Sequence, residues 1–384
     1  MKRLNSIFKM DKKNRHQILL WLIGGLILTF ATEIFLRGSI KEVVSWVKET
    51  PGVMLANYLL ILMLTSIFFL AKRKYMVYFI SFVVILGVSI TTFFLMKVRG
   101  TPLTFSDLYS IGEAMEIADK YINPTIIIIG IVCIAFLVVF CVFLYKLDGD
   151  TKRFKLINFV LVFVVSAVFF TTVKSQQAKN IMVYKRWDIP ASYKCNGLTY
   201  STVESCLKYI RTKPNDYSQS KIAKIKEKVD KAEANDNRKL NKNKPNVLFV
   251  QLEAFMDPET IKGVKYSKDP IPNFRKLTKL YTSGMANVPT TGGGTVRTEF
   301  EVMTGNNIDY LTPGEIPYST ILKSKYYNSV ATTLSSQGYE THAVHNFQGN
   351  FYGRNNAYGK LGFGDFTSQE YMSGYELNER NWIK

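Results

Sequence analysis

Long apolar runs dominate the first half of the chain and are absent from the second half. A helix needs about 20 apolar residues to cross the hydrocarbon core of a bilayer. Five stretches meet this requirement, and Glu33 is their only acidic residue: Ile18–Leu36, Val53–Ala71, Val77–Met96, Thr125–Tyr145 and Leu156–Val173. None of them contains Lys, Arg or Asp. The pattern predicts a five-span transmembrane domain over residues 1–173, whose first span is too long for a cleaved signal peptide.

The basic residues of the loops predict how these spans are oriented. They gather in the N-terminal tail and in the second-to-third and fourth-to-fifth loops, at positions Lys2, Arg3, Lys9, Lys12, Lys13, Arg15, Lys72, Arg73, Lys74, Lys146, Lys152, Arg153 and Lys155. Loops rich in Lys and Arg stay on the cytoplasmic side. We therefore expect a multi-pass protein of the cell membrane with a cytoplasmic N-terminus and an extracellular C-terminal half.

The third-to-fourth loop, residues 99–123, carries apolar residues at helical spacing: Leu108, Ile111, Met115 and Ile117. With Ser106 or Asp107 as a cap, this spacing predicts an amphipathic helix on the outer membrane surface.

A connector of residues 174–244 follows the last span. Its charged run Ser220–Ala234 predicts a solvated spacer helix. Cys195 and Cys206 also lie in the connector and could form a disulfide. Cys133 and Cys141 fall inside an apolar span, where packing explains them.

Polar residues then enclose shorter apolar segments. Asn246–Leu252 is a continuous apolar run that is typical of a buried parallel strand, with further strands at Met285–Val288 and Tyr339–His345. Helices are expected over Pro272–Ser283 and Tyr327–Gln337. This alternation predicts that residues 245–384 form part of an α/β domain with a mostly parallel sheet.

The formal net charge of +19 changes this picture little. No nucleic-acid-binding motif accompanies it, so we expect no nucleic-acid partner. Cytoplasmic loops and contact with anionic lipid account for a basic membrane protein.

Two candidate chemical groups lie in the second half. Glu253 follows the first predicted strand, where a carboxylate can bind a hard metal ion or be an ordinary loop acid. Gly292–Gly294 precede Thr295 and a segment that looks helical through Met303. Such a helix start can bind a phosphate or activate a Thr hydroxyl as a nucleophile. Equally, Thr295 could serve only as the N-cap of the helix.

A third group contains His342, His345, the Phe351–Tyr352 pair and Arg354. The two histidines are three positions apart, so on a strand they face opposite ways and should not share a metal. An Arg with aromatic rings suits a phosphorylated polyol, and a plain polar loop is the alternative.

These groups, in this order after five spans, resemble the lipoteichoic acid synthase family of the sulfatase and alkaline-phosphatase-like superfamily. In NVLFVQLE the resemblance implies that Glu253 binds the metal, and in GGGTVRTEF that Thr295 is the nucleophile, followed by the family's pair Glu299–Phe300. His345, Tyr352 and Arg354 take the places of the family's substrate-binding residues. Family members commonly carry Trp in place of Tyr352 and Asn in place of Gly353.

The resemblance implies a mechanism as well. Manganese or magnesium would bind Glu253 and Thr295, and Thr295 would attack the phosphate of phosphatidylglycerol and release diacylglycerol. A growing glycerophosphate chain or a glycolipid acceptor would then take the glycerophosphate from Thr295. Whether the product is a polymer or a single-unit primer stays open.

The superfamily's metal site also needs an Asp–His pair, which does not occur in this sequence. The expectation is therefore either the N-terminal part of a longer protein or a truncated and inactive relative. Two other functions stay in view: a phosphoethanolamine transferase or other enzyme of the superfamily, and a non-enzymatic membrane scaffold.

Overall fold

The computed structural model describes residues 12–110, 124–147, 156–185, 188–210, 216–234, 244–252, 255–289, 294–312 and 314–377. The chain divides into two compact units. One contains residues 1–209 and 289–384, and the other contains residues 210–288.

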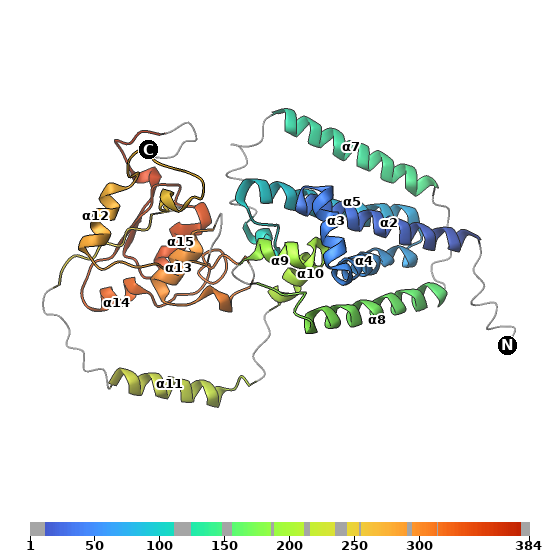
Figure 1. Ribbon diagram of the computed structural model, residues 1–384. Helices are drawn as coiled ribbons and strands as arrows, with labels where there is room; N and C mark the ends of the chain where they lie inside the picture. The colour runs from blue at the N-terminus through green and yellow to red at the C-terminus, as the bar shows by residue number, and fades with distance from the viewer. Residues whose placement is uncertain are drawn as a thin grey trace. The chain divides into compact units, whose positions relative to one another are not determined.

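Five long apolar helices of the described residues occupy the five predicted spans (Figure 1): α2 (Lys12–Arg37), α4 (Pro51–Thr65) with its 3-10 extension η1 (Ser66–Leu70), α5 (Lys74–Arg99), α7 (Pro124–Leu147) and α8 (Leu156–Ala178). Each is long and apolar enough to cross a membrane. The predicted number and positions of these helices are confirmed, and their orientation stays a prediction.

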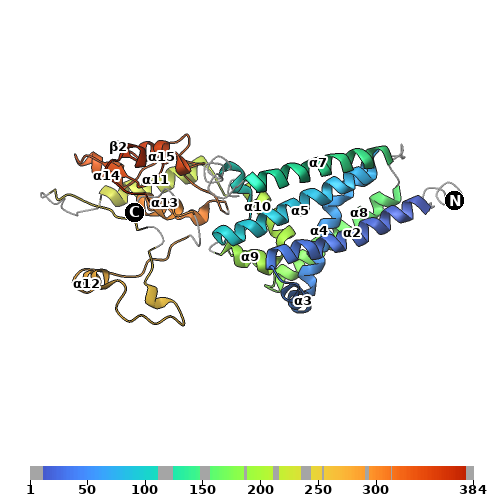
Figure 2. The same ribbon diagram turned by 90° about the horizontal axis from the view of Figure 1, so that it is seen from above.

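Helices α2, α4, α5 and α8 run side by side (Figures 1 and 2). Trp21 of α2 is buried against Phe68 and Phe69, and its indole Nε1 donates to the Leu62 carbonyl at 3.0 Å. Helix α7 packs on α5 through Phe79 and Phe140, whose ring centroids lie 4.8 Å apart. The outward faces of these helices are apolar, as lipid contact requires.

Three shorter helices in this region had not been predicted: α3 (Ile40–Glu49), α9 (Ile189–Asn196) and α10 (Leu198–Tyr209). Asp188 caps α9 by accepting the Ala191 N–H at 2.8 Å. Gly197 joins α9 to α10 with φ +84, a left-handed value that favours glycine.

Polar side chains of two long helices hold the α9–α10 hairpin in place. Glu33 of α2 accepts the Leu198 N–H at 2.8 Å, and Asn57 of α4 accepts the Tyr200 N–H at 3.0 Å. The Asn57 amide also donates to the Asn196 carbonyl at 2.8 Å. Glu33 and Asn57 are fully buried, so these bonds satisfy polar groups that are shielded from water.

Of the predicted amphipathic helix, the structure shows the 3-10 turn η2 (Phe105–Ser110), and residues 111–123 lie outside the described part. All four cysteines are free, and the Cys195 thiol donates to the Ile181 carbonyl at 3.1 Å. The optional Cys195–Cys206 disulfide is therefore not formed in this structure.

The second unit contains the predicted spacer helix, α11 (Gln219–Ala234), which is exposed on all sides. It also contains the 3-10 turn η3 (Pro258–Thr260) and α12 (Pro272–Leu280), which ends three residues before the predicted helix does. The predicted strands Asn246–Leu252 and Met285–Val288 are wrong, because both segments are irregular and exposed. A strand needs a neighbour's N–H and C=O groups, and no described segment pairs with either of them.

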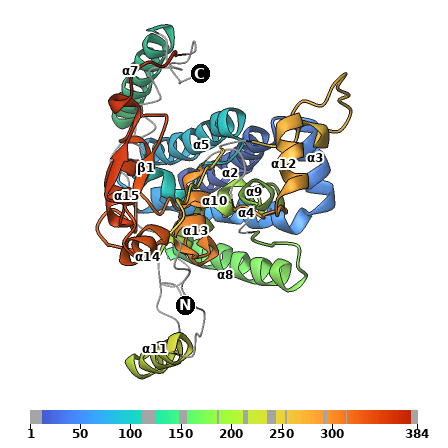
Figure 3. The ribbon, with the colours of Figure 1, turned by 90° about the vertical axis from the view of Figure 1, so that its left-hand side faces the viewer.

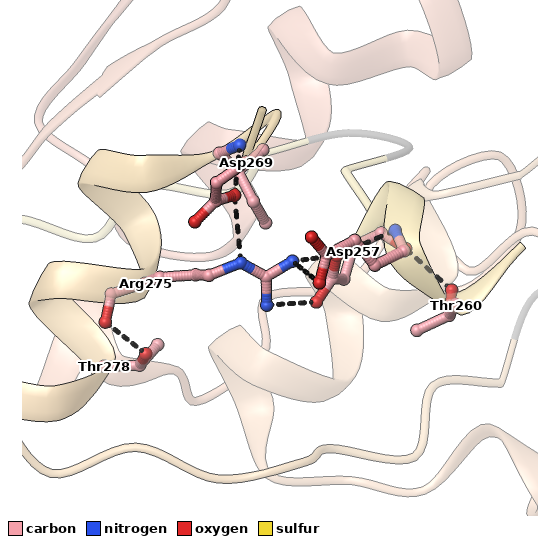
Figure 4. Close-up of polar contacts among 7 residues, drawn as sticks. Asp257, Thr260, Asp269, Arg275 and Thr278 are labelled. Atoms are coloured by element: carbon pink, nitrogen blue, oxygen red, sulfur yellow. Dashed lines mark hydrogen bonds and ion pairs between the residues drawn. The ribbon is translucent and has the colours of Figure 1, made fainter. Parts of the chain in front are cut away.

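Arg275 of α12 anchors the loop that precedes it (Figure 4). Its guanidinium donates to both Asp257 carboxylate oxygens, at 2.8 and 2.7 Å, and to Asp269 at 3.0 Å. Glu259 adds a third carboxylate at 2.8 Å. The hydrogen bonds from Arg275 lower the pKa of Asp257, so the loop is held by charge rather than by an apolar core.

The C-terminal part of the first unit has a small α/β arrangement (Figure 3). Strands β1 (His342–Val344) and β2 (Asp365–Thr367) pair in parallel, with His342 opposite Asp365. Beside them lie α13 (Val296–Thr304), α14 (Val330–Ser336) and α15 (Arg354–Lys360), with the 3-10 turns η4 (Ile308–Tyr310), η5 (Phe351–Gly353) and η6 (Gln369–Tyr371). The predicted strand at Tyr339–His345 is confirmed over residues 342–344, and the predicted helix at Tyr327–Gln337 over residues 330–336.

Buried side chains from α13, α15, β1 and the segments between them form the core of this part: Val296, Phe300, Ile308, Tyr318, Leu322, Ala343, Ala357, Tyr358 and Leu361. This core fixes α13 relative to α15, and these two helices carry most of the candidate site.

Candidate active site

Thr295 lies at the start of α13, where the predicted Gly-rich turn enters the helix. Gly294 has φ +85, and the Thr295 carbonyl accepts the Glu299 N–H at 3.0 Å. The Thr295 side chain makes no capping hydrogen bond to the first helical turn. Thr295 thus occupies the N-cap position of α13 without a side-chain capping bond, and both interpretations of Thr295 remain predictions. Gly292 and Gly293 lie outside the described residues.

Glu299, one turn further along α13, forms a buried ion pair with Arg354 at the start of α15. Arg354 Nη2 donates to Glu299 Oε1 at 2.6 Å, and its Nε donates to Oε2 at 3.3 Å. The Tyr358 hydroxyl donates to the same Oε2 at 3.2 Å. Burial acts to lower the pKa of Arg354, but the Glu299 carboxylate outweighs it and the pKa is raised. The guanidinium therefore stays charged.

The aromatic pair Phe351–Tyr352 lies against the Arg354 side chain. The guanidinium carbon is 5.3 Å from the centroid of the Tyr352 ring and 5.8 Å from that of Phe351. Tyr352 has φ +59 and Gly353 has φ +66, both left-handed. Gly and Asn tolerate this conformation best, which explains why Gly353 can stand where the resembled family commonly has Asn. A tyrosine in this conformation is strained, and such strain concentrates at functional loops.

His345 follows β1 and is half-buried on the same side as Arg354. Its backbone N–H donates to the Thr367 carbonyl at 2.9 Å. The Nε2 atom of its ring is buried and has no hydrogen-bond partner among the described residues. Burial, together with the positive charge of Arg354, lowers the pKa of His345 to about 4. The ring is therefore neutral at neutral pH and has a nitrogen available to a ligand.

His342 has different surroundings. It is exposed, and its Nδ1 lies 2.7 Å from Asp365 Oδ2 on β2. The two histidines thus have different neighbours, and His345 lies just outside β1.

Glu253, the predicted metal ligand, lies outside the described residues. Within the described ranges, no three His, Cys, Asp or Glu side chains gather as a group that could hold a metal ion. The described residues thus do not by themselves form a metal site, and the expected manganese or magnesium stays a prediction.

The structure therefore brings Thr295, Tyr352, His345 and Arg354 onto one small scaffold. Sequence reasoning had named Glu299 without a role and had missed Tyr358. The four-residue spacing of Arg354 and Tyr358 on one helix was the available signal, because such residues share a helix face.

Comparison with known proteins relates the segment that contains these residues to a known family. The family model described as Sulfatase matches residues 245–383, the segment that contains all of these side chains. The chain is also similar to the "Putative cyclic beta-1,2-glucan modification protein" of Rhizobium meliloti (strain 1021), at 32% identity over 186 residues. That match covers 48% of this chain and 28% of the relative, so the chain spans well under two thirds of that protein. No solved structure matches.

Residues 245–383 are thus similar to sulfatases, and five apolar helices near the N-terminus precede them. Membrane association follows from the composition of those helices.

Proposed function

We propose that this chain carries the transfer site of a membrane glycerophosphotransferase, which uses phosphatidylglycerol on the outer face of the cell membrane to build a polyglycerolphosphate such as lipoteichoic acid. One observation carries the proposal: Thr295 immediately precedes the helix whose Glu299 is joined to Arg354, the residue next to the aromatic loop. The predicted nucleophile thus lies on the same scaffold as the loop that carries Phe351 and Tyr352.

The proposed reaction is an exchange of phosphoesters in two steps. Thr295 Oγ attacks the phosphorus of phosphatidylglycerol, the bond from phosphorus to the diacylglycerol oxygen breaks, and diacylglycerol leaves with the proton. An acceptor hydroxyl then attacks the glycerophospho-threonine, and Thr295 Oγ regains a proton as it departs. The positive end of α13 and its first-turn N–H groups favour the charge that develops at Thr295.

His345 and Tyr352 would hold the headgroup in this proposal. A neutral imidazole with an unpartnered buried nitrogen suits a glycerol hydroxyl, and an aromatic ring covers its carbons. A divalent cation belongs to the proposal as well, with Glu253 and Thr295 as this chain's ligands, and it would supply charge neutralisation at the phosphate.

The similarity to a protein named for cyclic glucan modification favours a sugar-bearing acceptor, such as a glycolipid. The donor has an alternative: phosphatidylethanolamine would make the same Thr295 a phosphoethanolamine acceptor.

The test is to supply membranes containing the full natural protein with phosphatidylglycerol or phosphatidylethanolamine, each labelled in its headgroup and its diacylglycerol. We expect diacylglycerol release from phosphatidylglycerol alone and a glycerophosphoryl group on the peptide that contains Thr295. Thr295→Ala should abolish both, whereas Thr333→Ala on α14, whose hydroxyl bonds the Ser329 carbonyl at 3.0 Å, should retain them. Undiminished consumption of phosphatidylglycerol by Thr295→Ala would contradict the proposal.

A non-enzymatic scaffold is the remaining alternative. Calorimetric titration of the full natural protein with Mn²⁺ separates the two, because a transferase of this class should bind the ion and a scaffold should not.

A further inference from the structure

We infer that Glu299 is a positioning residue: through its buried pair with Arg354 it holds the aromatic loop Phe351–Gly353 at a fixed place relative to Thr295. This inference rests on the proposed function for its catalytic consequence, but its structural consequence can be tested separately. It gives Arg354 a role different from direct contact with the substrate phosphate.

The first argument is that each nitrogen of the Arg354 guanidinium already donates a hydrogen bond within the protein. Its Nη2 and Nε donate to Glu299, and its Nη1 donates to the Phe351 carbonyl at 3.3 Å. Arg354 is only 1% exposed. A phosphate would have to displace a carboxylate that already satisfies this charge, whereas the loop residues before Arg354 are within its reach without any rearrangement.

The second argument is the conformation of the loop. Tyr352 and Gly353 both have positive φ, and for Tyr352, which carries a Cβ, such a conformation persists only where its surroundings impose it. Arg354 is the next residue, and it bonds back to the Phe351 carbonyl, so it encloses the two left-handed residues. Its pair with Glu299 is thus the attachment that ties this strained turn to α13.

The third argument is that the attachment lies close to the proposed nucleophile. Glu299 is four residues after Thr295, and its own N–H bonds the Thr295 carbonyl at 3.0 Å. Tyr358, four residues after Arg354, adds a second contact from α15 to the same carboxylate. We call the contacts of Glu299 with Arg354 and Tyr358 the clamp. It joins the first turn of α13, just after Thr295, to α15, which follows the aromatic loop.

A clamp and a phosphate ligand respond differently to paired substitutions. Removing one member of a buried ion pair leaves an uncompensated charge, whereas replacing both by apolar residues of similar volume is often neutral. If Arg354 acts through Glu299, the double variant Glu299→Met/Arg354→Met should recover what either single change loses. If Arg354 grips the phosphate, the double variant stays as defective as Arg354→Met.

The experiment compares Glu299→Gln, Arg354→Met and the double variant in the full natural protein, with the exposed Glu340→Gln as the control. Amide hydrogen exchange over residues 349–356 reports on the loop, and kcat and KM for phosphatidylglycerol report on the site. We expect each single change to speed loop exchange by about tenfold or more and to lower kcat/KM by about 10- to 100-fold, as loss of part of a buried pair implies. The double variant should return both to within about fivefold of the wild-type protein.

Two results would overturn the inference. Unchanged loop exchange in Glu299→Gln would show that no clamp exists, and this readout needs no turnover. A double variant with a protected loop but the full kcat/KM defect of Arg354→Met would assign Arg354 to the substrate. Absence of transfer by the wild-type protein would instead refute the proposed function, and the exchange data would still decide whether the clamp exists.

Discussion

Arg354 and Glu299 are 55 positions apart in the chain, yet their side chains meet at 2.6 Å in the buried centre of the sulfatase-like segment. Arg354 is 1% exposed and Glu299 is 8% exposed, so water screens the pair little. The pair joins two helices that share one small core, which makes it a structural element as well as part of the site.

The first prediction concerns this structural contribution. Glu299→Ala should lower the free energy of unfolding of this part of the chain by about 3–5 kcal/mol, since it strands a buried guanidinium. Denaturant titration followed by tyrosine fluorescence measures the change. Glu340→Ala, which alters an exposed carboxylate, should stay within about 0.5 kcal/mol of the wild-type protein. Equal effects of the two changes would contradict the prediction.

The second prediction concerns the left-handed turn. Gly353 and Gly359 both have open space where a Cβ would stand, but only Gly353 has a positive φ. Gly353→Ala should therefore destabilise by about 1–2 kcal/mol, the cost of a left-handed alanine. Gly359→Ala, inside α15, should stabilise by about 0.5–1 kcal/mol through helix propensity.

Thermal unfolding of the two alanine variants measures this difference, and Gly353→Asn serves as the matched control. Because Asn tolerates the left-handed region, it should lie between the wild-type protein and Gly353→Ala. Destabilisation by Gly359→Ala as large as that by Gly353→Ala would show that φ is not the cause.

The third prediction follows from the pKa of His345, which is about 4 in the folded protein against a reference value of 6.5. Between these values the unfolded chain binds a proton that the folded protein does not, so stability falls as the pH drops from 6.5 towards 4. Allowing for the partial exposure of the ring, we expect a loss of about 1–2 kcal/mol.

The comparison with His345→Asn isolates this contribution, because carboxylates such as Glu370, whose pKa is lowered, also respond to acid. The wild-type protein should lose more stability across this pH window than the variant does. Parallel stability curves for the two proteins would assign the acid sensitivity to other groups.

The five long helices could be predicted from the sequence because a run of about 20 apolar residues without charges is long enough to span a bilayer and too long for an ordinary strand. The strand predicted at Asn246–Leu252 is wrong, because an apolar run reads the same in the sequence whether or not a neighbouring strand pairs with it. Leu248 is 86% exposed in the structure, and nothing local to it in the sequence signals this.

In the candidate site, too, some features could be predicted from the sequence and others could not. Thr295, His345, Tyr352 and Arg354 carry recognisable chemistry, so their motifs were visible in the sequence. The engagement of Arg354 by Glu299 and Tyr358 depends on how α13 packs against α15, a long-range property that neither motif contains. The left-handed Tyr352 was hidden for a related reason, since a tyrosine does not mark such a turn as a glycine does.

The fourth prediction concerns the α9–α10 hairpin. A Cβ added at Gly197 would lie 2.3 Å from the Asn57 amide nitrogen, whereas one added at Gly38 meets nothing within 4 Å. Both glycines have positive φ, +84 and +73, and Gly197 also has ψ 156, a combination that essentially only glycine adopts, so its backbone adds to the cost of alanine. Gly197→Ala should therefore cost about 1–3 kcal/mol more than Gly38→Ala, the typical penalty of overpacking. Limited proteolysis in detergent, with cleavage within residues 181–210 as the readout, measures the difference, and equal cleavage of the two variants would contradict it.

The last prediction addresses the orientation of the helices, which rests on the distribution of Lys and Arg alone. With the four native cysteines replaced by Ser, a single cysteine is placed at Ser220, in the spacer helix, or at Lys72, between the second and third spans. A membrane-impermeant maleimide should label Ser220→Cys in intact cells and should label Lys72→Cys only after the cells are permeabilised. The reverse pattern would put Thr295 on the cytoplasmic side and remove the outer leaflet as its source of phosphatidylglycerol. Because the three spans between Lys72 and Ser220 place the two cysteines on opposite sides, labelling of both in intact cells would instead show that one of α5, α7 and α8 does not cross the membrane.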